Sequence, residues 1–288
     1  MTDNMNIQWY PGHMTKTRRQ IEADLKLVDA VCEIVDARIP VSSRNPDIDA
    51  ICGEKPRMIV LNRMDLADPA ATKKWAEYFR RKGMAVIATD CKSKKGISAF
   101  TPAARLACAE KLERDAKRGM NRPLRVMVVG IPNVGKSTLI NQISGRKSAK
   151  AENRPGVTRG KQWVTVDSGL QLLDTPGILW PKFEDPEVGM MLAYTGAVKE
   201  GVIDLEELAY RLMELLHKFY PKTLLERYKV EAPEGTLGWQ LLEMAARKRG
   251  YLVSGGEVNT ERMAKVLLDE FRSGKLGNFT LELPEDMV

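Results

Sequence analysis

Short apolar runs alternate with amphipathic stretches over the part of the chain that precedes Pro181. Six runs have the length and composition of strands: Ala30–Val35, Met58–Leu61, Ala85–Ala88, Arg125–Val129, Gln162–Val166 and Leu170–Leu173. Between them, Thr15–Val28 and Ala70–Lys82 place apolar residues at helical spacing. This alternation predicts an α/β fold with a doubly wound, mostly parallel sheet. The last two strands are separated only by residues 167–169, so they should form an antiparallel hairpin.

After Pro181 the strand pattern ends and helical spacing takes over. Leucines recur every three or four positions between Leu205 and Phe219, and Asp204 with Glu207 has the spacing of a capping box at the start of this helix. Further helices are predicted over Trp239–Gly250 and Asn259–Gly274. We therefore expect a smaller all-α domain over residues 182–288, following a sheet domain over residues 1–181.

Composition narrows the class of protein. With 288 residues, 43% of them hydrophobic and 29% charged, the chain can bury a core, and no apolar run approaches the roughly 18 residues of a membrane helix. The start lacks the pattern of a secretory signal, and the four cysteines form no CxxC pair, so we expect no membrane, no zinc site and a reducing cytoplasm. Residues 1–120 hold 22 Lys and Arg against 16 Asp and Glu, most of the net charge of +7, which hints at a polyanionic partner.

The most specific motif runs from Gly130 to Ser137 and reads GIPNVGKS, which satisfies GxxxxGK[ST]. It follows a predicted strand and precedes a predicted helix, as a loop that surrounds a polyphosphate with backbone N–H groups must. Lys136 would bridge the terminal phosphates, and the Ser137 hydroxyl would bind Mg²⁺. The nucleotide-binding residues predicted here are Asn133, Val134, Gly135, Lys136, Ser137 and Thr138.

Two further motifs follow at the spacing of a nucleotide switch. Asp174 comes directly after the strand that ends at Leu173, where it can hold Mg²⁺ through water, and Gly177 can donate its N–H to a γ-phosphate. Thr158 lies between the phosphate loop and Asp174, and it is placed to complete the Mg²⁺ shell. The predicted Mg²⁺ ligands are therefore Ser137, Thr158 and Asp174.

A base-reading motif precedes the phosphate loop. Asn62-Arg63-Met64-Asp65 follows the strand that ends at Leu61. The carboxylate of Asp65 can accept from guanine N1–H and from the 2-amino group, whereas adenine offers neither donor. Ordinary GTPases carry this motif after the phosphate loop. All these motifs lie at strand ends on one edge of a sheet, so a permuted chain order preserves the site, with the charged segment Ala103–Pro123 as the new joint.

Six motifs stand together in this chain: WYPGHM (9–14), DARIP (36–40), NRMD (62–65), GIPNVGKS (130–137), PGVTRG (155–160) and DTPGILWP (174–181). In this order they resemble the circularly permuted GTPases, in particular the bacterial ribosome biogenesis GTPase A family. The resemblance spans nearly the whole chain. It implies a P-loop GTPase domain and a helical RNA-binding domain that act in late assembly of the large (50S) ribosomal subunit. We expect a monomer, although the sequence leaves the oligomeric state open. Such proteins bind rRNA and precursor particles with GTP, are stimulated by the particle, and leave after hydrolysis to GDP.

The resemblance also suggests roles for residues outside the main motifs. The family usually has Lys where this chain has Arg63, and its base-contacting loop is only approximated by Thr89–Lys92, which makes Cys91 and Lys92 candidate contacts. The position that holds a water-orienting Gln in many GTPases is Ile178 here, so another group must orient the water. His13 is the candidate catalytic group, together with Lys136; the alternative is that His13 caps a helix or contacts RNA. Asn133 is a candidate K⁺ ligand, or an ordinary loop residue.

Basic clusters offer candidate RNA contacts, although most charged runs are solvated helix faces. We prefer the cluster Arg146–Lys161 and the triplet Arg247, Lys248 and Arg249. Two other functions stay open at this point: a nucleotide-dependent docking module whose hydrolysis is incidental, and a P-loop ATPase or small-molecule kinase.

Overall fold

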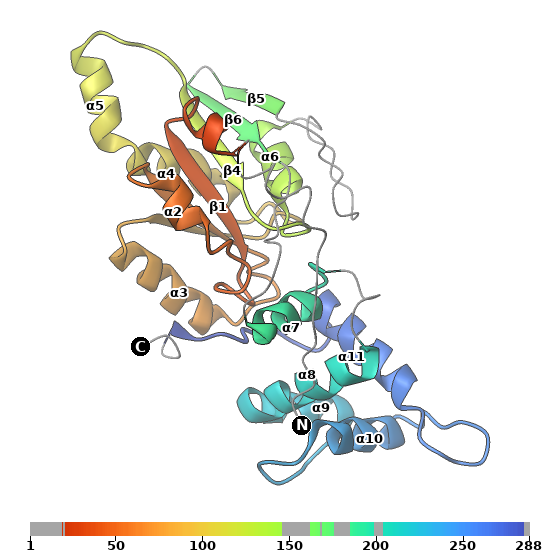
Figure 1. The fold of residues 1–288 in the computed structure, drawn as a ribbon. Coiled ribbons are helices and arrows are strands. Elements are labelled where there is room, and N and C mark those ends of the chain that lie inside the picture. The colour runs from red at the N-terminus through yellow and green to blue at the C-terminus, as the bar shows by residue number, and fades with distance from the viewer. Residues whose placement is uncertain are drawn as a thin grey trace. The chain divides into compact units, whose positions relative to one another are not determined.

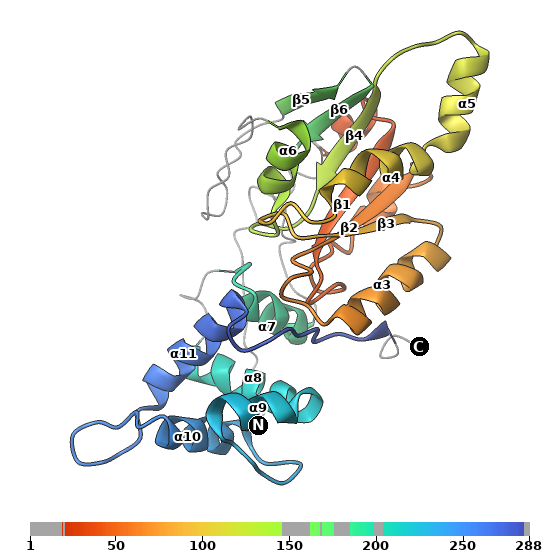
Figure 2. The same cartoon turned by 180° about the vertical axis from the view of Figure 1, so that it is seen from behind.

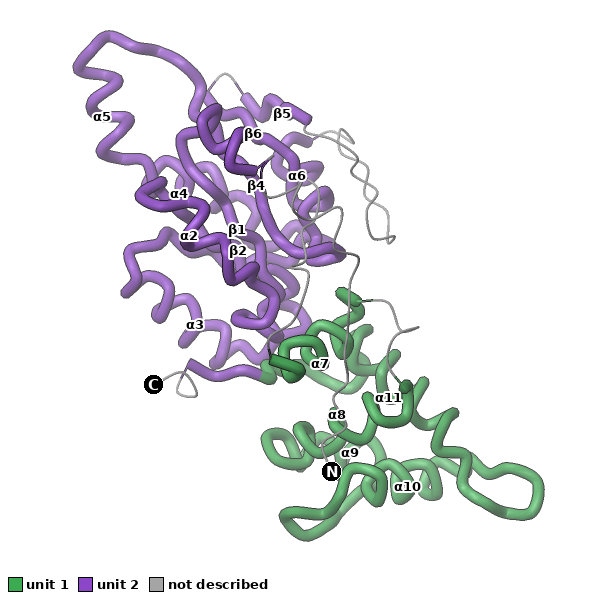
Figure 3. The backbone as a smooth tube through the Cα atoms, viewed as in Figure 1, with its two compact units in different colours: residues 1–7, 183–281 green, residues 8–182, 282–288 purple. Residues whose placement is uncertain are grey.

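The computed structural model describes residues 19, 21–145, 162–167, 169–175, 185–198 and 204–284. The chain divides into two compact units, drawn in two colours in Figure 3. We call residues 8–182 and 282–288 the sheet unit, and residues 1–7 and 183–281 the helical unit. The domain boundary expected at residue 181 lies outside the described residues. The chain therefore leaves the sheet unit once and returns to it at Glu282.

The sheet unit contains one six-stranded sheet. Its strands are β1 (Ala30–Asp36), β2 (Arg57–Asn62), β3 (Ala85–Thr89), β4 (Leu124–Val129), β5 (Gln162–Asp167) and β6 (Leu170–Asp174). Their order in the sheet is β3-β2-β1-β4-β6-β5 (Figure 1). Every neighbouring pair is parallel except β5 and β6, which form the expected antiparallel hairpin. The fold class and all six strands predicted from the apolar runs are confirmed.

Helices cover both faces of this sheet, as Figures 1 and 2 show from opposite sides. Within the described residues these helices are α2 (Ile48–Cys52), α3 (Pro69–Arg81), α4 (Phe100–Ala107), α5 (Ala109–Lys117) and α6 (Lys136–Ser144), with a 3-10 turn over Ile97–Ala99. Residues 21–25, the described part of the helix predicted over Thr15–Val28, are helical as well. The apolar face of α3 inserts Trp75 and Phe79 into the core beside Val35 of β1. Asp68 caps this helix by accepting from the backbone N–H groups of Ala70 and Ala71. The segment expected to be the permutation joint is largely helical, since all of α5 and most of α4 lie within it.

All four cysteines lie in the sheet unit as buried free thiols: Cys32, Cys52, Cys91 and Cys108. Burial raises the pKa of each thiol above its ordinary value, to about 11 for Cys52, Cys91 and Cys108.

The helical unit consists of α7 (Pro186–Tyr194), α8 (Leu205–Phe219), α9 (Pro221–Tyr228), α10 (Gly238–Lys248) and α11 (Thr260–Ser273) within the described residues. Asp204 caps α8 through two backbone N–H groups, but Glu207 forms an ion pair with Arg211. The last three predicted helices are thus confirmed, whereas α7 and α9 were not among the predicted elements. Over the described part of the chain, no helix has the length and apolarity needed to cross a membrane.

One carboxylate holds three segments of the helical unit together. Glu270 on α11 accepts from Arg227 and from the Tyr228 hydroxyl of α9, the latter at 2.8 Å, and from Arg249 after α10 at 3.4 Å. Arg249 also lies over the Tyr228 ring. We call these four residues the Glu270 cluster. Hydrogen bonds from Arg227 are the main cause that lowers the pKa of Glu270, against its burial.

Candidate nucleotide-binding site

The predicted motifs meet at the carboxyl ends of the parallel strands. β1 ends at Asp36, β2 at Asn62 and β6 at Asp174, while β4 leads directly into the loop 130–135. Because these strands are parallel, their carboxyl ends share one edge of the sheet, which is where doubly wound sheets bind ligands.

The loop 130–135 has the backbone of a phosphate-binding turn. Asn133 has a φ of 60° and Gly135 a φ of 108°, and α6 starts directly after this loop at Lys136. A Cβ on Gly135 would lie 2.4 Å from Nδ2 of Asn62, so only glycine allows the two loops to approach so closely. Ser137 and Thr138 are half-buried in the first turn of α6, where the backbone N–H groups have no partner within the helix. This turn can therefore receive phosphate oxygens.

Two buried charges flank the phosphate position. The Lys136 ammonium group donates to the carbonyls of Gly130 and Ile131 at 3.4 and 3.5 Å, and burial lowers its pKa to about 8, with Asp174 opposing the shift. Burial raises the pKa of Asp174, against Lys136 and the Thr175 N–H. A polyphosphate would favour the charged form of Lys136, and a cation would favour the Asp174 carboxylate.

The donor set fits Mg²⁺. Asp174 is 1% exposed, and its Oδ1 atom has no hydrogen-bond partner within the described residues. A buried carboxylate oxygen without a donor is suited to a cation or its bound water, and the Ser137 hydroxyl supplies a second oxygen. Thr158 and Gly177, the other predicted partners of the phosphate and the metal, lie outside the described residues.

Asn62 ties three loops of the edge together. Its Nδ2 donates to the carbonyl of Val134 at 2.7 Å, and its Oδ1 accepts from the Thr89 hydroxyl at 3.1 Å and from the Cys91 N–H at 3.3 Å. Asn62 is 3% exposed, so these bonds are shielded from water. The sequence predicted Asn62 as a nucleotide contact, and the structure gives it contacts to the loops that surround the nucleotide.

Arg63 and Asp65, which follow Asn62 in the same motif, face different parts of the site. Arg63 has a φ of 61°, and its Nη2 donates to the Asn133 carbonyl at 2.7 Å, while Nε lies 3.7 Å from the Asp36 carboxylate. Asp65 is exposed two residues later, at the same end of β2. The structure thus ties Arg63 to the phosphate loop and leaves Asp65 facing solvent, where a base can reach it.

The loop after β3 is closed by an Asp90 turn. The Asp90 carboxylate accepts from the N–H groups of Lys92 and Ser93, and Asp90 N–H donates to the Lys95 carbonyl. Cys91 is buried and its N–H donates to Asn62, whereas Lys92 is exposed. Of the two predicted base-contacting residues, Cys91 therefore bonds to the specificity motif through Asn62, and Lys92 is the next residue in the chain.

A buried ion pair at the end of β1 was not among the predicted site residues. Arg38, which is 0% exposed, donates through Nε and Nη2 to the two carboxylate oxygens of Asp36, at 2.9 and 2.7 Å. Burial alone would raise the pKa of Asp36, but Arg38 and then Arg63 lower it below its ordinary value. The DARIP motif at 36–40 marked this segment in the sequence, although nothing there indicated an ion pair.

The candidate RNA and catalytic residues differ in how far the structure describes them. His13, Ile178 and the cluster Arg146–Lys161 lie outside the described residues. In the helical unit, Arg249 belongs to the Glu270 cluster, whereas Lys248 is exposed and Arg247 pairs with Glu243 on the surface of α10.

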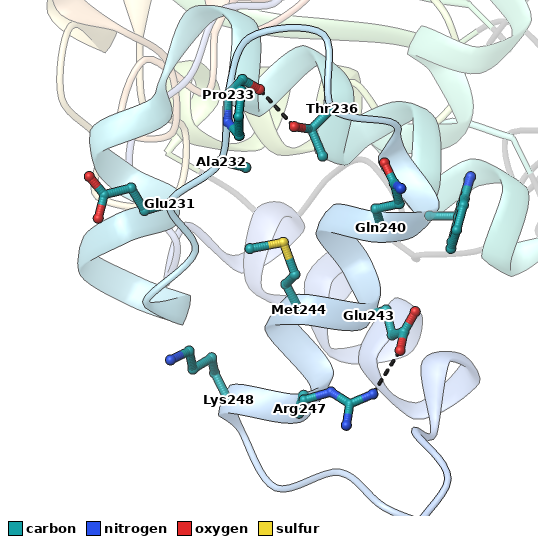
Figure 4. Close-up of a pocket in the computed structure, with 10 residues that line it drawn as sticks. Glu231, Ala232, Pro233, Thr236, Gln240, Glu243, Met244, Arg247 and Lys248 are labelled. Carbon is teal, nitrogen blue, oxygen red and sulfur yellow. Dashed lines mark hydrogen bonds and ion pairs between the residues drawn. The ribbon is translucent and has the colours of Figure 1, made fainter.

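Arg247 and Lys248 also line a cavity of about 660 Å³ beside α10 (Figure 4). Pro233, Met244 and Trp239 contribute apolar surface to it, and Trp239 is 48% exposed.

Comparisons with known proteins agree with this geometry. The profile of a family described as 50S ribosome-binding GTPase matches residues 125–218. The chain is similar to Ribosome biogenesis GTPase A of Bacillus cereus, with 45% identity over 284 residues that cover 98% of this chain and 95% of the relative. Its identity to Ribosome biogenesis GTPase A of Thermotoga maritima is 34% over 282 residues, covering 98% and 96%. Among solved structures, GDP-bound TM YlqF superposes with a TM-score of 0.67 at 30% identity, covering 93% of this chain and 100% of that one.

Proposed function

The chain belongs to the ribosome biogenesis GTPase A family, and from this premise we propose that it is a nucleotide-controlled switch in late assembly of the large ribosomal subunit. As a member of this family it is a GTPase of ribosome biogenesis. In the proposed cycle the GTP form binds a 50S precursor particle, the particle accelerates hydrolysis, and the GDP form leaves. The observation that carries the proposal is the meeting of the phosphate loop, Asp174 and Asn62–Asp65 at one sheet edge.

In this proposal, different residues of the site bind the phosphates, the base and Mg²⁺. The loop 130–135 and the first turn of α6 receive the phosphates, and the Lys136 ammonium group neutralises their charge. Asp65 accepts from guanine, while Asn62 and Arg63 hold the base-reading loop against the phosphate loop. Ser137, Asp174 and Thr158 would hold Mg²⁺, which when bound neutralises charge on the β- and γ-phosphates.

Hydrolysis needs a group that orients the attacking water. Ile178 cannot do so, and we propose His13 for this role, because an imidazole accepts and donates protons near neutral pH. We also propose that Asn133 helps to bind K⁺, whose charge would stand in for an arginine finger. The K⁺ proposal is tested by comparing GTP turnover in matched KCl and NaCl buffers. Equal rates would remove the K⁺ proposal.

RNA contacts are proposed for the exposed cations of the helical unit. Lys248 and Arg247 can reach phosphates, whereas Arg249 is held by Glu270 and Tyr228. We therefore propose Arg247 and Lys248 as the RNA contacts of this triplet and assign Arg249 a mainly structural role.

The central experiment measures GTP turnover in K⁺ buffer alone, with large subunits or their precursors, and with small subunits as the control. Stimulation confined to the large subunit or its precursor supports the switch. Binding to the particle without stimulation would instead favour a docking module whose hydrolysis is incidental.

Base choice is tested separately with Asp65→Asn. We expect this variant to lose GTP affinity by at least 100-fold, because the amide places an NH2 donor against one of the two guanine donors and carries no negative charge, and to leave ATP binding unchanged. An equal affinity of the native protein for ATP would contradict guanine selection.

A further inference from the structure

The chain returns to the sheet unit at Glu282, a residue to which neither the motifs nor the proposed function assigns a role. Its carboxylate accepts from the backbone N–H of Val41 at 2.6 Å and from the N–H of Ser42 at 3.1 Å, as well as from the Ser42 hydroxyl. Its carbonyl accepts from the indole N–H of Trp75 on α3 at 2.8 Å. A single residue thus fixes the loop that follows β1 to the body of the sheet unit.

This loop, residues 37–43, is closed at its other end on Asp36. The Asp36 N–H donates to the Ser43 hydroxyl oxygen at 2.9 Å, and the same hydroxyl donates to the Ile39 carbonyl at 2.7 Å. Ser43 is 0% exposed, so water does not compete for these bonds. Glu282 holds Ser42, and the neighbouring Ser43 holds the Asp36 N–H, so the loop adds to the pairing with β2 that places the Asp36 backbone.

Asp36 is linked to the phosphate loop through Arg63. Its carboxylate is held by Arg38 and faces Arg63 Nε at 3.7 Å, and Arg63 donates to the Asn133 carbonyl at 2.7 Å. These contacts form a continuous path from Glu282 through residues 41–43, Asp36 and Arg63 to the phosphate loop. Each step lies within the sheet unit.

We propose that Glu282 is a positioning residue for guanine-nucleotide binding, acting through the 37–43 loop and Arg63 on the phosphate loop. The inference rests on the nucleotide site proposed above. Glu282 touches neither the phosphate loop nor Asp65, so it acts on affinity by holding Arg63 in the geometry that closes the loop. Burial raises the pKa of the Glu282 carboxyl, against its hydrogen bonds from Ser42 and Val41.

The test is a double-mutant cycle on the affinity for a fluorescent GDP analogue, made in the full chain with Glu282→Ala, Arg63→Ala and both together. We expect Glu282→Ala to weaken GDP binding about three- to tenfold, the range of typical coupling between linked sites. In the Arg63→Ala background the same change should have almost no further effect, because the path is already cut. Additive losses, or unchanged affinity in Glu282→Ala, would overturn the proposal.

Two controls separate positioning from folding. Glu282→Gln keeps one acceptor oxygen for the Val41 and Ser42 donors, so it should restore most of the affinity that Glu282→Ala loses. Glu234→Ala removes an exposed carboxylate of the helical unit and should leave GDP affinity unchanged. If Glu282→Ala does not fold, Glu282→Asp takes its place in the cycle, because it keeps the charge but draws the carboxylate one methylene away from Val41 and Ser42. Failure of the native protein itself to bind GDP would contradict the proposed nucleotide site instead.

Discussion

Two arginine–carboxylate clusters in this molecule use the same chemistry for different ends. In the sheet unit, Arg38 holds Asp36, and the pair continues through Arg63 to the phosphate loop. In the helical unit, Arg227 holds Glu270, whose other partners come from the helices that pack around it. Arginine lowers the pKa of both carboxyl groups. The two clusters differ in what surrounds them. The Asp36–Arg38 pair lies at the sheet edge that binds the nucleotide, so a change in it can alter nucleotide affinity. The Glu270 cluster lies among helices and holds them together.

The largest effect is expected from Arg38→Ala. Removing one partner of a buried pair costs about 3–5 kcal/mol of the free energy of unfolding, because the remaining carboxylate keeps its desolvation penalty. We also expect the folded fraction to bind GDP more weakly, since Asp36 no longer sits firmly against Arg63. Urea unfolding and GDP titration measure the two effects. A stability loss with intact GDP affinity would place the Asp36 pair in the same class as the Glu270 cluster.

Glu270→Gln should show the opposite combination. We expect a loss of about 1–3 kcal/mol in the free energy of unfolding, because Arg227 and Tyr228 lose a charged acceptor. GDP affinity of the folded protein should stay within error of the native value. A drop in that affinity would mean that the helical cluster also acts on the nucleotide site.

The same cluster predicts an acid dependence of stability. The pKa of Glu270 lies below its ordinary value of 4.5 in the folded protein, chiefly through the hydrogen bonds of Arg227. Its stabilisation is therefore complete above about pH 4.5 and is lost as the pH falls through the folded pKa, at no more than about 1.4 kcal/mol per pH unit. Urea unfolding between pH 3 and 6 should show a steeper acid decline in the native protein than in Glu270→Gln. Parallel curves would contradict the assignment.

The smallest effect on stability is expected from Arg247→Ala. Its pair with Glu243 is exposed, so the free energy of unfolding should change by less than about 0.5 kcal/mol. Binding to large-subunit particles should nevertheless weaken, with a smaller dependence on salt, because one phosphate contact is lost. Arg249→Ala gives the useful contrast, since it should destabilise the Glu270 cluster. Equal effects of the two changes on stability would contradict the assignment of Arg249 to a structural role that Arg247 lacks.

The sequence predicted well those features that local pattern encodes. Buried parallel strands read as apolar runs, so β1 to β4 could be located, and the spacing of Gly135 and Lys136 after β4 identified the phosphate loop. Contacts between distant residues left no such signal. Glu282 lies between Leu281 and Leu283, more than 200 residues from its partner Ser42, and Arg249 looks like its exposed neighbours in the basic triplet. The role of Asn62 was likewise visible only once its three partner loops were placed together.

The buried thiols have a practical consequence for watching this molecule at work. A thiolate is the form that reacts with maleimide or iodoacetamide probes, and burial disfavours it at all four native cysteines. A new cysteine on an exposed face, at Lys117 of α5 or Lys222 of α9, would therefore be labelled selectively without first removing the native ones. One dye on each unit would then allow energy transfer between them to be followed through a single round of GTP binding and hydrolysis.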